Sequence, residues 1–191
     1  MEECLEGRGE VVLREVGIRR GQVVLDFGCG SGNYTIPAAK IVGDGGVVYA
    51  LDKNEWVLDE LMRKAESEGL RNIIRIDTSG EIETGLDDDS VDVVLLYDIF
   101  WYFPLRDAKL TELLDEVYRV SKPDALLSVY PKHIDSGRLR EKIERCGFTL
   151  RDVYSEMLLH NSRLEKGELF NFARARDIPP KYFILNGINS E

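Results

Sequence analysis

The chain has 191 residues, 43% of them hydrophobic, and its 25 basic and 35 acidic residues give a formal net charge of −10. A chain of this length can bury about 70% of its unfolded surface in a single domain, and its acidity disfavours nucleic acid as a partner. Three scattered cysteines, no secretory signal and no apolar run near the roughly 20 residues that span a bilayer favour a cytoplasmic protein without a membrane partner.

A glycine-rich turn is the most informative feature near the N-terminus. A short helix is expected at about residues 9–17, and a buried strand beginning at Val23 leads into Asp26–Gly32, which reads D-F-G-C-G-S-G. Residues 34–42 fit a helix, so the glycines lie between a strand and a helix. Glycine permits positive φ and removes the Cβ atoms that hold a ligand away, and the unpaired N–H groups of a first helical turn favour an anionic or acceptor group.

Acids also close the next three strands. They are Asp52 after residues 47–51, Asp77 after residues 73–76, and Asp98 after residues 91–97. In an open parallel sheet the ligand lies beyond the carboxyl ends of the strands, where a carboxylate can accept hydrogen bonds from both ribose hydroxyls of a nucleoside. Asp52 could instead cap the following helix, a role for which Asn54 competes.

The alternation of strands and helices continues toward the C-terminus. An apolar stripe between Leu110 and Tyr118 predicts a helix, and residues 126–130 predict a strand. A further helix is expected at about 138–145, followed by strand candidates at 148–157 and 169–175. These last two form an expected antiparallel pair.

The acid-led glycine pattern and the acids at the strand ends resemble the class I methyltransferases that use S-adenosylmethionine. The resemblance covers roughly residues 9–175 and implies one domain over 1–191, with a cofactor-binding core at about 21–133 and a C-terminal helix and strand pair at about 136–175. It implies an α/β, Rossmann-like class I methyltransferase fold: a mostly parallel seven-stranded sheet with an antiparallel closing strand and helices on both faces. The chain departs from the family's lysine-proline-glycine-glycine turn, because Asp124 and Ala125 replace the glycines.

The resemblance also implies S-adenosyl-L-methionine as the cofactor. The residues that it implies for cofactor binding are Asp26, Gly28, Cys29, Gly30, Gly32, Asp52, Lys53, Asp77, Thr78 and Tyr97. Among them, the family pattern places Asp26 near the amino group of the methionine moiety and Asp52 at the ribose. Asp77 and Thr78 are expected at the adenine, although an Asx turn after a strand would look the same.

The methyl acceptor is expected beside the loops that follow the fourth and fifth strands. The catalytic candidates there are Asp98, Tyr102 and His133, and a base is needed only when the acceptor loses a proton. Phe100, Trp101 and Phe103 could contact the acceptor or pack under the next helix as core. The sequence shows no Cys-x-x-Cys motif or histidine-rich cluster, so it predicts no metal site.

These patterns together predict a methyltransferase that transfers a methyl group by in-line displacement to an unidentified small molecule or protein side chain. One alternative keeps cofactor binding but lacks catalysis, as a binding protein or a platform for partners. An RNA methyltransferase is disfavoured by the net charge. A Rossmann-type dehydrogenase is disfavoured because its Gly-x-Gly-x-x-Gly motif would need a glycine where Asn33 stands. The oligomeric state is left open.

Overall fold

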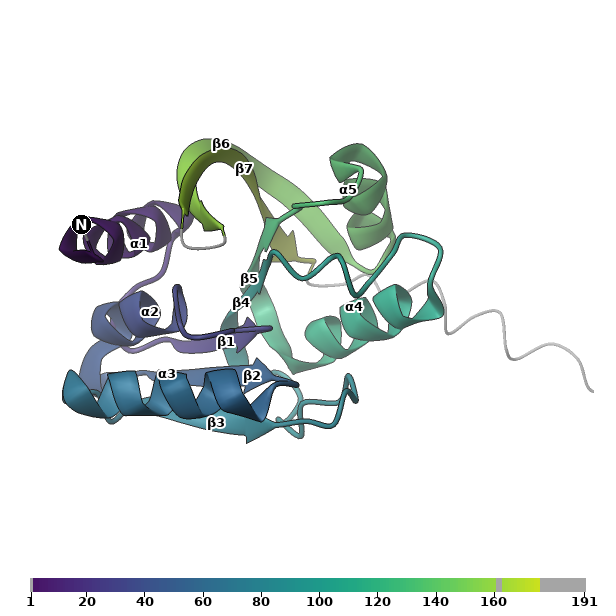
Figure 1. The fold of residues 1–191 in the computed structure, drawn as a ribbon. Coiled ribbons are helices and arrows are strands. Elements are labelled where there is room, and N and C mark those ends of the chain that lie inside the picture. The colour runs from purple at the N-terminus through teal and green to yellow at the C-terminus, as the bar shows by residue number, and fades with distance from the viewer. Residues whose placement is uncertain (1, 161–162, 176–191) are drawn as a thin grey trace, which may run out of the picture.

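The computed structural model describes residues 2–160 and 163–175, with side chains from residue 7 onward. These residues build one seven-stranded sheet with helices on both sides (Figure 1). The strands are β1 (Val23–Phe27), β2 (Val47–Asp52), β3 (Ile73–Asp77), β4 (Val91–Tyr97), β5 (Ser121–Tyr130), β6 (Phe148–His160) and β7 (Arg163–Arg174). The helices are α1 (Glu2–Val16), α2 (Thr35–Val42), α3 (Glu55–Ser67), α4 (Ala108–Val120) and α5 (Ser136–Arg145), with a 3₁₀ turn, η1, at Gly43–Gly45.

The sheet is parallel through its first five strands and closes with an antiparallel strand. Its order is β3-β2-β1-β4-β5-β7-β6, and β7 runs antiparallel to both β5 and β6. The predicted Rossmann-like sheet with an antiparallel closing strand is therefore confirmed. The central strands β1 and β4 are almost entirely buried, which explains why their sequences are nearly continuous apolar runs.

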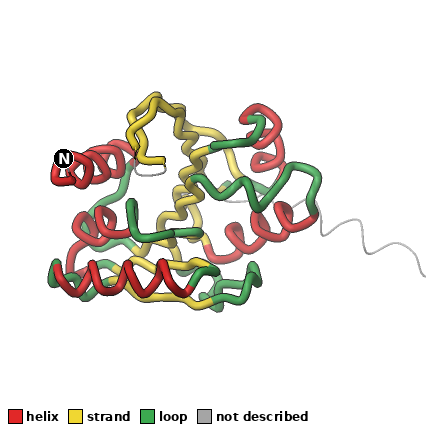
Figure 2. Tube along the Cα trace, viewed as in Figure 1, coloured by secondary structure: helices red, strands yellow, loops and turns green. Residues whose placement is uncertain are grey.

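Helices cover both faces of the sheet, and each face has its own apolar core. Successive strand residues point to opposite faces, so Val24 packs with the cluster that contains residues of α1, α2 and α3. Leu25 packs with the cluster that contains residues of α4 and α5. Figure 2 shows this arrangement, with helices on either side of the strands. None of the described helices is long and apolar enough to cross a membrane.

The β6–β7 hairpin is long and curved, and it arches toward α1 (Figure 1). Two contacts tie the hairpin to the N-terminal half of the chain. Arg8 of α1 pairs with Glu156 of β6 at 2.5 Å, and the Leu159 N–H donates a 3.0 Å hydrogen bond to the Tyr34 hydroxyl. The second contact holds the end of β6 beside the start of α2.

Several predicted boundaries were wrong. The N-terminal helix begins at Glu2 rather than at about residue 9, so Gly9 lies within the helix and does not mark its start. A Cβ at Gly9 would lie 2.8 Å from Pro37 Cγ, so its small size permits α1 to approach α2 closely. Strand β6 continues past residue 157 to His160, and β7 begins at Arg163 instead of residue 169. Gly167, which lies between the two predicted strands, therefore pairs with Glu156 inside the hairpin.

The start of β5 was also predicted too late. The strand begins at Ser121 instead of residue 126, and its pairing with β4 is irregular between Val91 and Val93. Asp124 has φ +65°, the left-handed conformation that glycine adopts most readily and that Asp tolerates better than most residues. Asp124 thus adopts a glycine-like backbone conformation within β5, at the position where the family pattern has glycine.

Candidate cofactor and acceptor site

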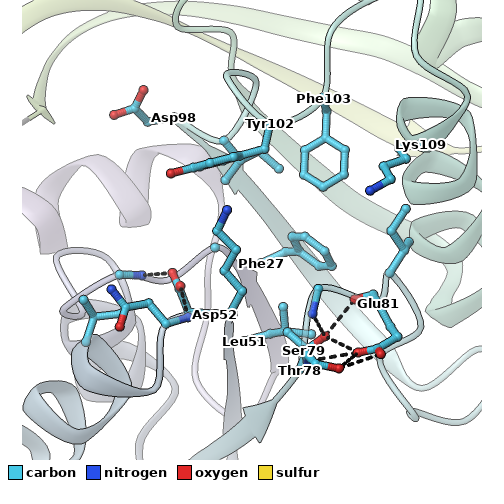
Figure 3. A pocket seen from close by; sticks show the side chains of 18 residues that line it. Phe27, Leu51, Asp52, Thr78, Ser79, Glu81, Asp98, Tyr102, Phe103 and Lys109 are labelled. Atoms are coloured by element: carbon cyan, nitrogen blue, oxygen red, sulfur yellow. Dashed lines mark hydrogen bonds between the residues drawn. The ribbon is translucent and has the colours of Figure 1, made fainter.

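A cavity of about 600 Å³ opens at the carboxyl ends of β1, β2, β3 and β4. This is the edge at which open α/β sheets bind their ligands. Its lining residues are Phe27, Gly28, Gly30, Leu51, Asp52, Lys53, Asn54, Val57, Thr78, Ser79, Gly80, Glu81, Ile82, Asp98, Ile99, Tyr102, Phe103 and Lys109. In Figure 3, Asp98, Tyr102 and Phe103 lie on one side of the cavity, and Thr78, Ser79 and Glu81 lie on the other.

The three loop glycines are required for different reasons, although all have positive φ. A Cβ at Gly28 would lie 2.4 Å from Ile99 Cγ2, and one at Gly32 would lie 2.4 Å from Leu61 Cδ1. Both positions are therefore fixed by packing. Gly30 has φ +51° and no atom within 4 Å of the position of a Cβ. Because Gly30 also lines the cavity, it is the point at which a ligand can approach the backbone most closely.

Asp52 holds the glycine loop in place and also lines the cavity. One carboxylate oxygen accepts a 3.0 Å hydrogen bond from the Gly30 N–H, and the other accepts a 2.9 Å bond from the Asn54 N–H. Asn54 is the N-cap of α3, since its side chain accepts from the Trp56 N–H at 3.0 Å. The alternative in which Asp52 caps this helix is thereby excluded.

Asp26 lies beneath the loop and is not among the cavity-lining residues. It is 3% exposed and accepts a 2.6 Å hydrogen bond from the Thr35 hydroxyl. Burial raises the pKa of the Asp26 carboxyl from 3.8 to about 6; the hydrogen bond from Thr35 opposes this shift, and the nearby charge of Asp52 adds to it. Contact between Asp26 and the methionine moiety stays a prediction.

Two other predicted cofactor residues lie in the interior, outside the cavity lining. Cys29 is buried, donates its backbone N–H to Leu51 O at 3.0 Å, and has a thiol pKa that burial raises. Tyr97 is buried, and its hydroxyl lies 2.8 Å from Ser128 Oγ. Burial raises the pKa of Tyr97 as well. Both side chains therefore support the loop and sheet in this structure.

The predicted adenine pair separates in the structure. Asp77 is paired with Arg75 at 2.6 Å and is not among the cavity-lining residues, whereas Thr78 lines the cavity. Thr78 Oγ1 donates a 2.9 Å hydrogen bond to Glu81 O, and the Glu81 carboxylate accepts from the Ser79 N–H at 2.9 Å. These bonds order a loop at residues 78–82, directly after a predicted strand end, and apart from Thr78 its residues were not predicted as part of the site.

Lys53 and Tyr102 lie together on the cavity wall. The Lys53 ammonium lies 3.6 Å from the centre of the Tyr102 ring, which is a cation–π contact between the end of β2 and the loop after β4. Of the neighbouring aromatic residues, Phe100 is buried and Phe103 packs partly against the core, as the core interpretation predicted. Trp101 is 68% exposed, so that interpretation was wrong for Trp101.

Asp98 and both histidines of the chain meet beside this cavity. His133 Nε2 lies 3.7 Å from Asp98 Oδ1, and His160 Nδ1 lies 2.5 Å from Asp98 Oδ2. Asp98 lines the cavity, and both Asp98 and His133 adopt a positive φ. Asp98 and His133 were predicted from the sequence, but His160 was not, because the predicted strand ended at residue 157 and β6 continues to His160. The available signal was that the only two histidines both follow or end strands.

Residues 24–124 match a protein-family model described as "Methyltransferase domain". This match covers more than half of the chain and includes the glycine loop, Asp52 and Asp98. The chain belongs to the class I methyltransferase family. The cofactor of this family is S-adenosylmethionine.

Named relatives of this methyltransferase domain share only part of their length with it. A demethylmenaquinone methyltransferase from Lactobacillus johnsonii is 32% identical over 118 residues, which are 61% of this chain and 46% of the relative. A sterol 24-C-methyltransferase from Gibberella zeae is 27% identical over 188 residues, which are 92% of this chain and 48% of the relative. The chain thus spans about half the length of these relatives.

The fold of the methyltransferase domain also matches a solved structure. A SAM-dependent methyltransferase from Aquifex aeolicus superposes with a TM-score of 0.72 at 24% identity, covering 87% of this chain and 89% of the other. At this identity the likeness concerns the fold.

The residues present fit the family's cofactor. Gly30 exposes backbone that a Cβ would otherwise cover, Asp52 places a carboxylate at the end of β2, and Thr78 lies across the cavity. A carboxylate at the end of the second strand suits ribose hydroxyls. We therefore expect Gly30, Asp52, Lys53 and Thr78 to hold S-adenosylmethionine, with Gly28 and Gly32 shaping the loop.

Proposed function

We propose that this domain transfers the methyl group of S-adenosylmethionine to a small-molecule acceptor. The observation that carries the proposal is that one cavity is lined both by Gly30 and Asp52 and by Asp98 and Tyr102. The first pair belongs to the elements that suit the cofactor, and the second pair follows β4, where an acceptor can approach. This shared lining supports a cofactor and an acceptor that meet in the same cavity.

The chemistry requires mainly alignment from the protein. The bound cofactor supplies a methyl group on a positively charged sulfonium, which is already activated toward a nucleophile. Positioning two reactants in the correct geometry can contribute about 7–11 kcal/mol to catalysis. The wall formed by Phe27, Phe103 and Tyr102 would exclude water from part of the cavity, while Asp98 offers a polar contact to the acceptor.

Asp98, Tyr102 and His133 remain the candidates for contact with the acceptor. Asp98 and Tyr102 line the cavity, and His133 lies behind Asp98. We propose that Asp98 orients the acceptor and that His133 positions Asp98. If the acceptor is a hydroxyl or an amine, this pair would also receive its proton.

Two features support a small and partly apolar acceptor. The names of the relatives refer to a menaquinone precursor and a sterol, and both are small molecules with large apolar parts. On this chain, Trp101 and Tyr102 are 68% and 61% exposed beside the cavity wall, and such exposed aromatic surface suits an apolar ligand. A protein side chain as acceptor would need a surface that places it in the same cavity.

A cytoplasmic location also stays a prediction. Of the cysteines whose side chains are described, Cys29 and Cys146 are buried free thiols, which suits a reducing compartment. Fractionation of cells that express the native protein would test the location.

The first test measures cofactor binding. S-adenosylmethionine and S-adenosylhomocysteine are titrated calorimetrically into the wild-type protein and into Asp52→Ala, with Asp77→Ala as the matched strand-end control. We expect saturable binding by the wild type, weaker binding by Asp52→Ala and unchanged binding by Asp77→Ala. Absence of binding by folded wild-type protein would contradict the proposal.

The second test separates catalysis from binding alone. Wild-type protein is incubated with methyl-labelled cofactor and small-molecule extracts that have been fractionated from polar to apolar. Transfer of label into an apolar fraction supports the proposed acceptor class. A protein that binds the cofactor but labels none of the fractions would instead favour the non-catalytic alternative.

A further inference from the structure

The cluster of Asp98, His133 and His160 brings together residues at or after the ends of three different strands. Asp98 follows β4, His133 lies in the loop after β5, and His160 is the last residue of β6. One ligand-type atom from each residue lies within 4.8 Å of the other two. The curved β6–β7 hairpin makes this possible, because it carries His160 back toward the ends of the parallel strands.

One carboxylate oxygen of the cluster lacks a hydrogen-bond partner among the described residues. Asp98 Oδ2 contacts His160 Nδ1 at 2.5 Å, but Asp98 Oδ1 is buried and has no hydrogen-bond partner among the described residues. Its neighbour His133 Nε2 is 3.7 Å away, too far for a direct hydrogen bond. A buried carboxylate oxygen without a partner is costly, and a bound cation would satisfy it.

The donor set suits a transition metal. Two imidazoles and one carboxylate are the ligand set of catalytic zinc sites and of other open transition-metal sites. Zinc–ligand bonds of about 2.0–2.1 Å in a tetrahedron place the ligand atoms about 3.3 Å apart. The separations of 2.5 and 3.7 Å lie on either side of this value, so small side-chain rotations suffice. Mg²⁺ and Ca²⁺ prefer oxygen ligands alone.

The surroundings of the cluster would keep the histidines in place. Glu165 Oε1 lies 3.9 Å from His160 Nδ1 and is itself held by Lys132 Nζ at 2.5 Å and by the Tyr130 hydroxyl at 3.2 Å. The Trp101 ring lies against the His133 ring, with centroids 4.7 Å apart. The fixed carboxylate beside His160 and the ring packed on His133 would limit the movement of the two imidazoles.

We propose that Asp98, His133 and His160 bind one divalent transition-metal ion of the zinc type, with coordination positions left open toward the cavity that Asp98 lines. On binding, the metal takes the place of the hydrogen bond between His160 Nδ1 and Asp98 Oδ2, and the proton of that bond is released to solvent. His133 then completes the ligand set. The assignment does not depend on methyl transfer, because the three ligands belong to the described structure whether or not the domain is catalytic.

The test is a metal titration of the full chain after chelator treatment. Zn²⁺ is titrated by calorimetry, Co²⁺ is followed by its visible absorption, and Mg²⁺ serves as the oxygen-preferring comparison. The titrations are repeated in a Cys4→Ser background, because a thiol also binds zinc. We expect one Zn²⁺ per chain in both backgrounds, a Co²⁺ spectrum without thiolate charge-transfer bands, and no comparable binding of Mg²⁺.

Variants locate the site on the chain. His133→Gln and His160→Gln should each weaken Zn²⁺ binding at least tenfold, and Asp77→Asn, a strand-end carboxylate outside the cluster, should leave the affinity unchanged. Circular dichroism confirms that each variant is folded. Absence of saturable Zn²⁺ binding by the wild type would overturn the proposal without any variant, as would full affinity in both histidine variants or thiolate bands in the Co²⁺ spectrum.

Discussion

The cavity has two sides that are built in opposite ways: the side proposed for the cofactor, around Gly30 and Asp52, and the side proposed for the acceptor, around Asp98 and Tyr102. On the cofactor side, each Asp52 oxygen already accepts a backbone N–H, and the loop amides of Gly28 and Cys29 donate to Leu51 O. These bonds join β1, β2 and the loop between β1 and α2. On the other side, Asp98 follows β4, His133 lies in the loop after β5 and His160 ends β6. One Asp98 oxygen there has no hydrogen-bond partner among the described residues.

This difference shows which half is rigid and which half is adaptable. The cofactor side is fixed by hydrogen bonds and close packing, which suits a ligand shared by a whole family. The acceptor side contains a carboxylate oxygen without a hydrogen-bond partner among the described residues. Such an atom suits a ligand or ion that differs between family members. Substitutions in the first half should therefore change stability or cofactor affinity, and substitutions in the second should change what else is bound.

The largest effect should come from Gly28→Ala. The new Cβ would lie 2.4 Å from Ile99 Cγ2 at a residue with φ +81°, so left-handed strain and overpacking together should lower the free energy of unfolding by about 2–5 kcal/mol. Gly30→Ala is the control, because its Cβ meets no atom within 4 Å. We expect it to lose about 1 kcal/mol while weakening cofactor binding. Urea denaturation measures the free energy of unfolding of both variants. Equal losses of stability would show that packing at Gly28 and Gly30 does not differ in this way.

Asp26→Asn should stabilise the protein in a pH-dependent manner. Because burial raises the pKa of Asp26 from 3.8 to about 6, the folded state resists ionisation, so its stability falls as the pH rises from about 4 to 6 and stays lower above that. The variant removes this cost and should gain about 2 kcal/mol near pH 8, with the difference shrinking toward pH 4. Denaturation at several pH values tests this; a constant difference would contradict it.

Asp52→Ala should weaken S-adenosylmethionine binding by about tenfold to a hundredfold, the magnitude expected for lost hydrogen bonds to a charged group. The variant also frees the Gly30 N–H, so Asp52→Asn, which retains an acceptor oxygen, should lose less. Calorimetry compares the two. If both variants bind the cofactor as tightly as the wild type, the ribose assignment fails.

The smallest effect should come from Lys53→Gln. Its ammonium lies over the Tyr102 ring at 3.6 Å, and an exposed cation–π contact contributes about 0.5–1 kcal/mol. Because this contact joins the two halves of the cavity, Tyr102→Leu should show a similar loss, and the double variant should lose less than the sum. A double-mutant cycle from thermal unfolding measures the coupling, and strict additivity would indicate that the contact is not formed in solution.

Local patterns in the sequence were sufficient for the cofactor half. Alternating glycines, an acid at each strand end and apolar runs of strand length are short-range signals. The order of elements, the sheet class and the placement of Gly30 and Asp52 at the edge of the sheet could therefore be predicted. The environments of Asp77 and Tyr97 were harder to predict, and neither side chain lines the cavity. Whether a strand-end side chain faces the cavity, a salt bridge or the core depends on neighbours that are distant in sequence, such as Ser128 for Tyr97.

By itself, the sequence determined the class I methyltransferase family and its fold, and it predicted a cofactor site at the carboxyl edge of the sheet. Only the tertiary structure decided that Gly28 and Gly32 are packing positions, and that His160 meets Asp98 and His133. The reason is physical. A turn motif is confined to adjacent residues that fix one another's conformation, whereas the histidine–aspartate cluster depends on the length and curvature of the β6–β7 hairpin, which no local pattern encodes.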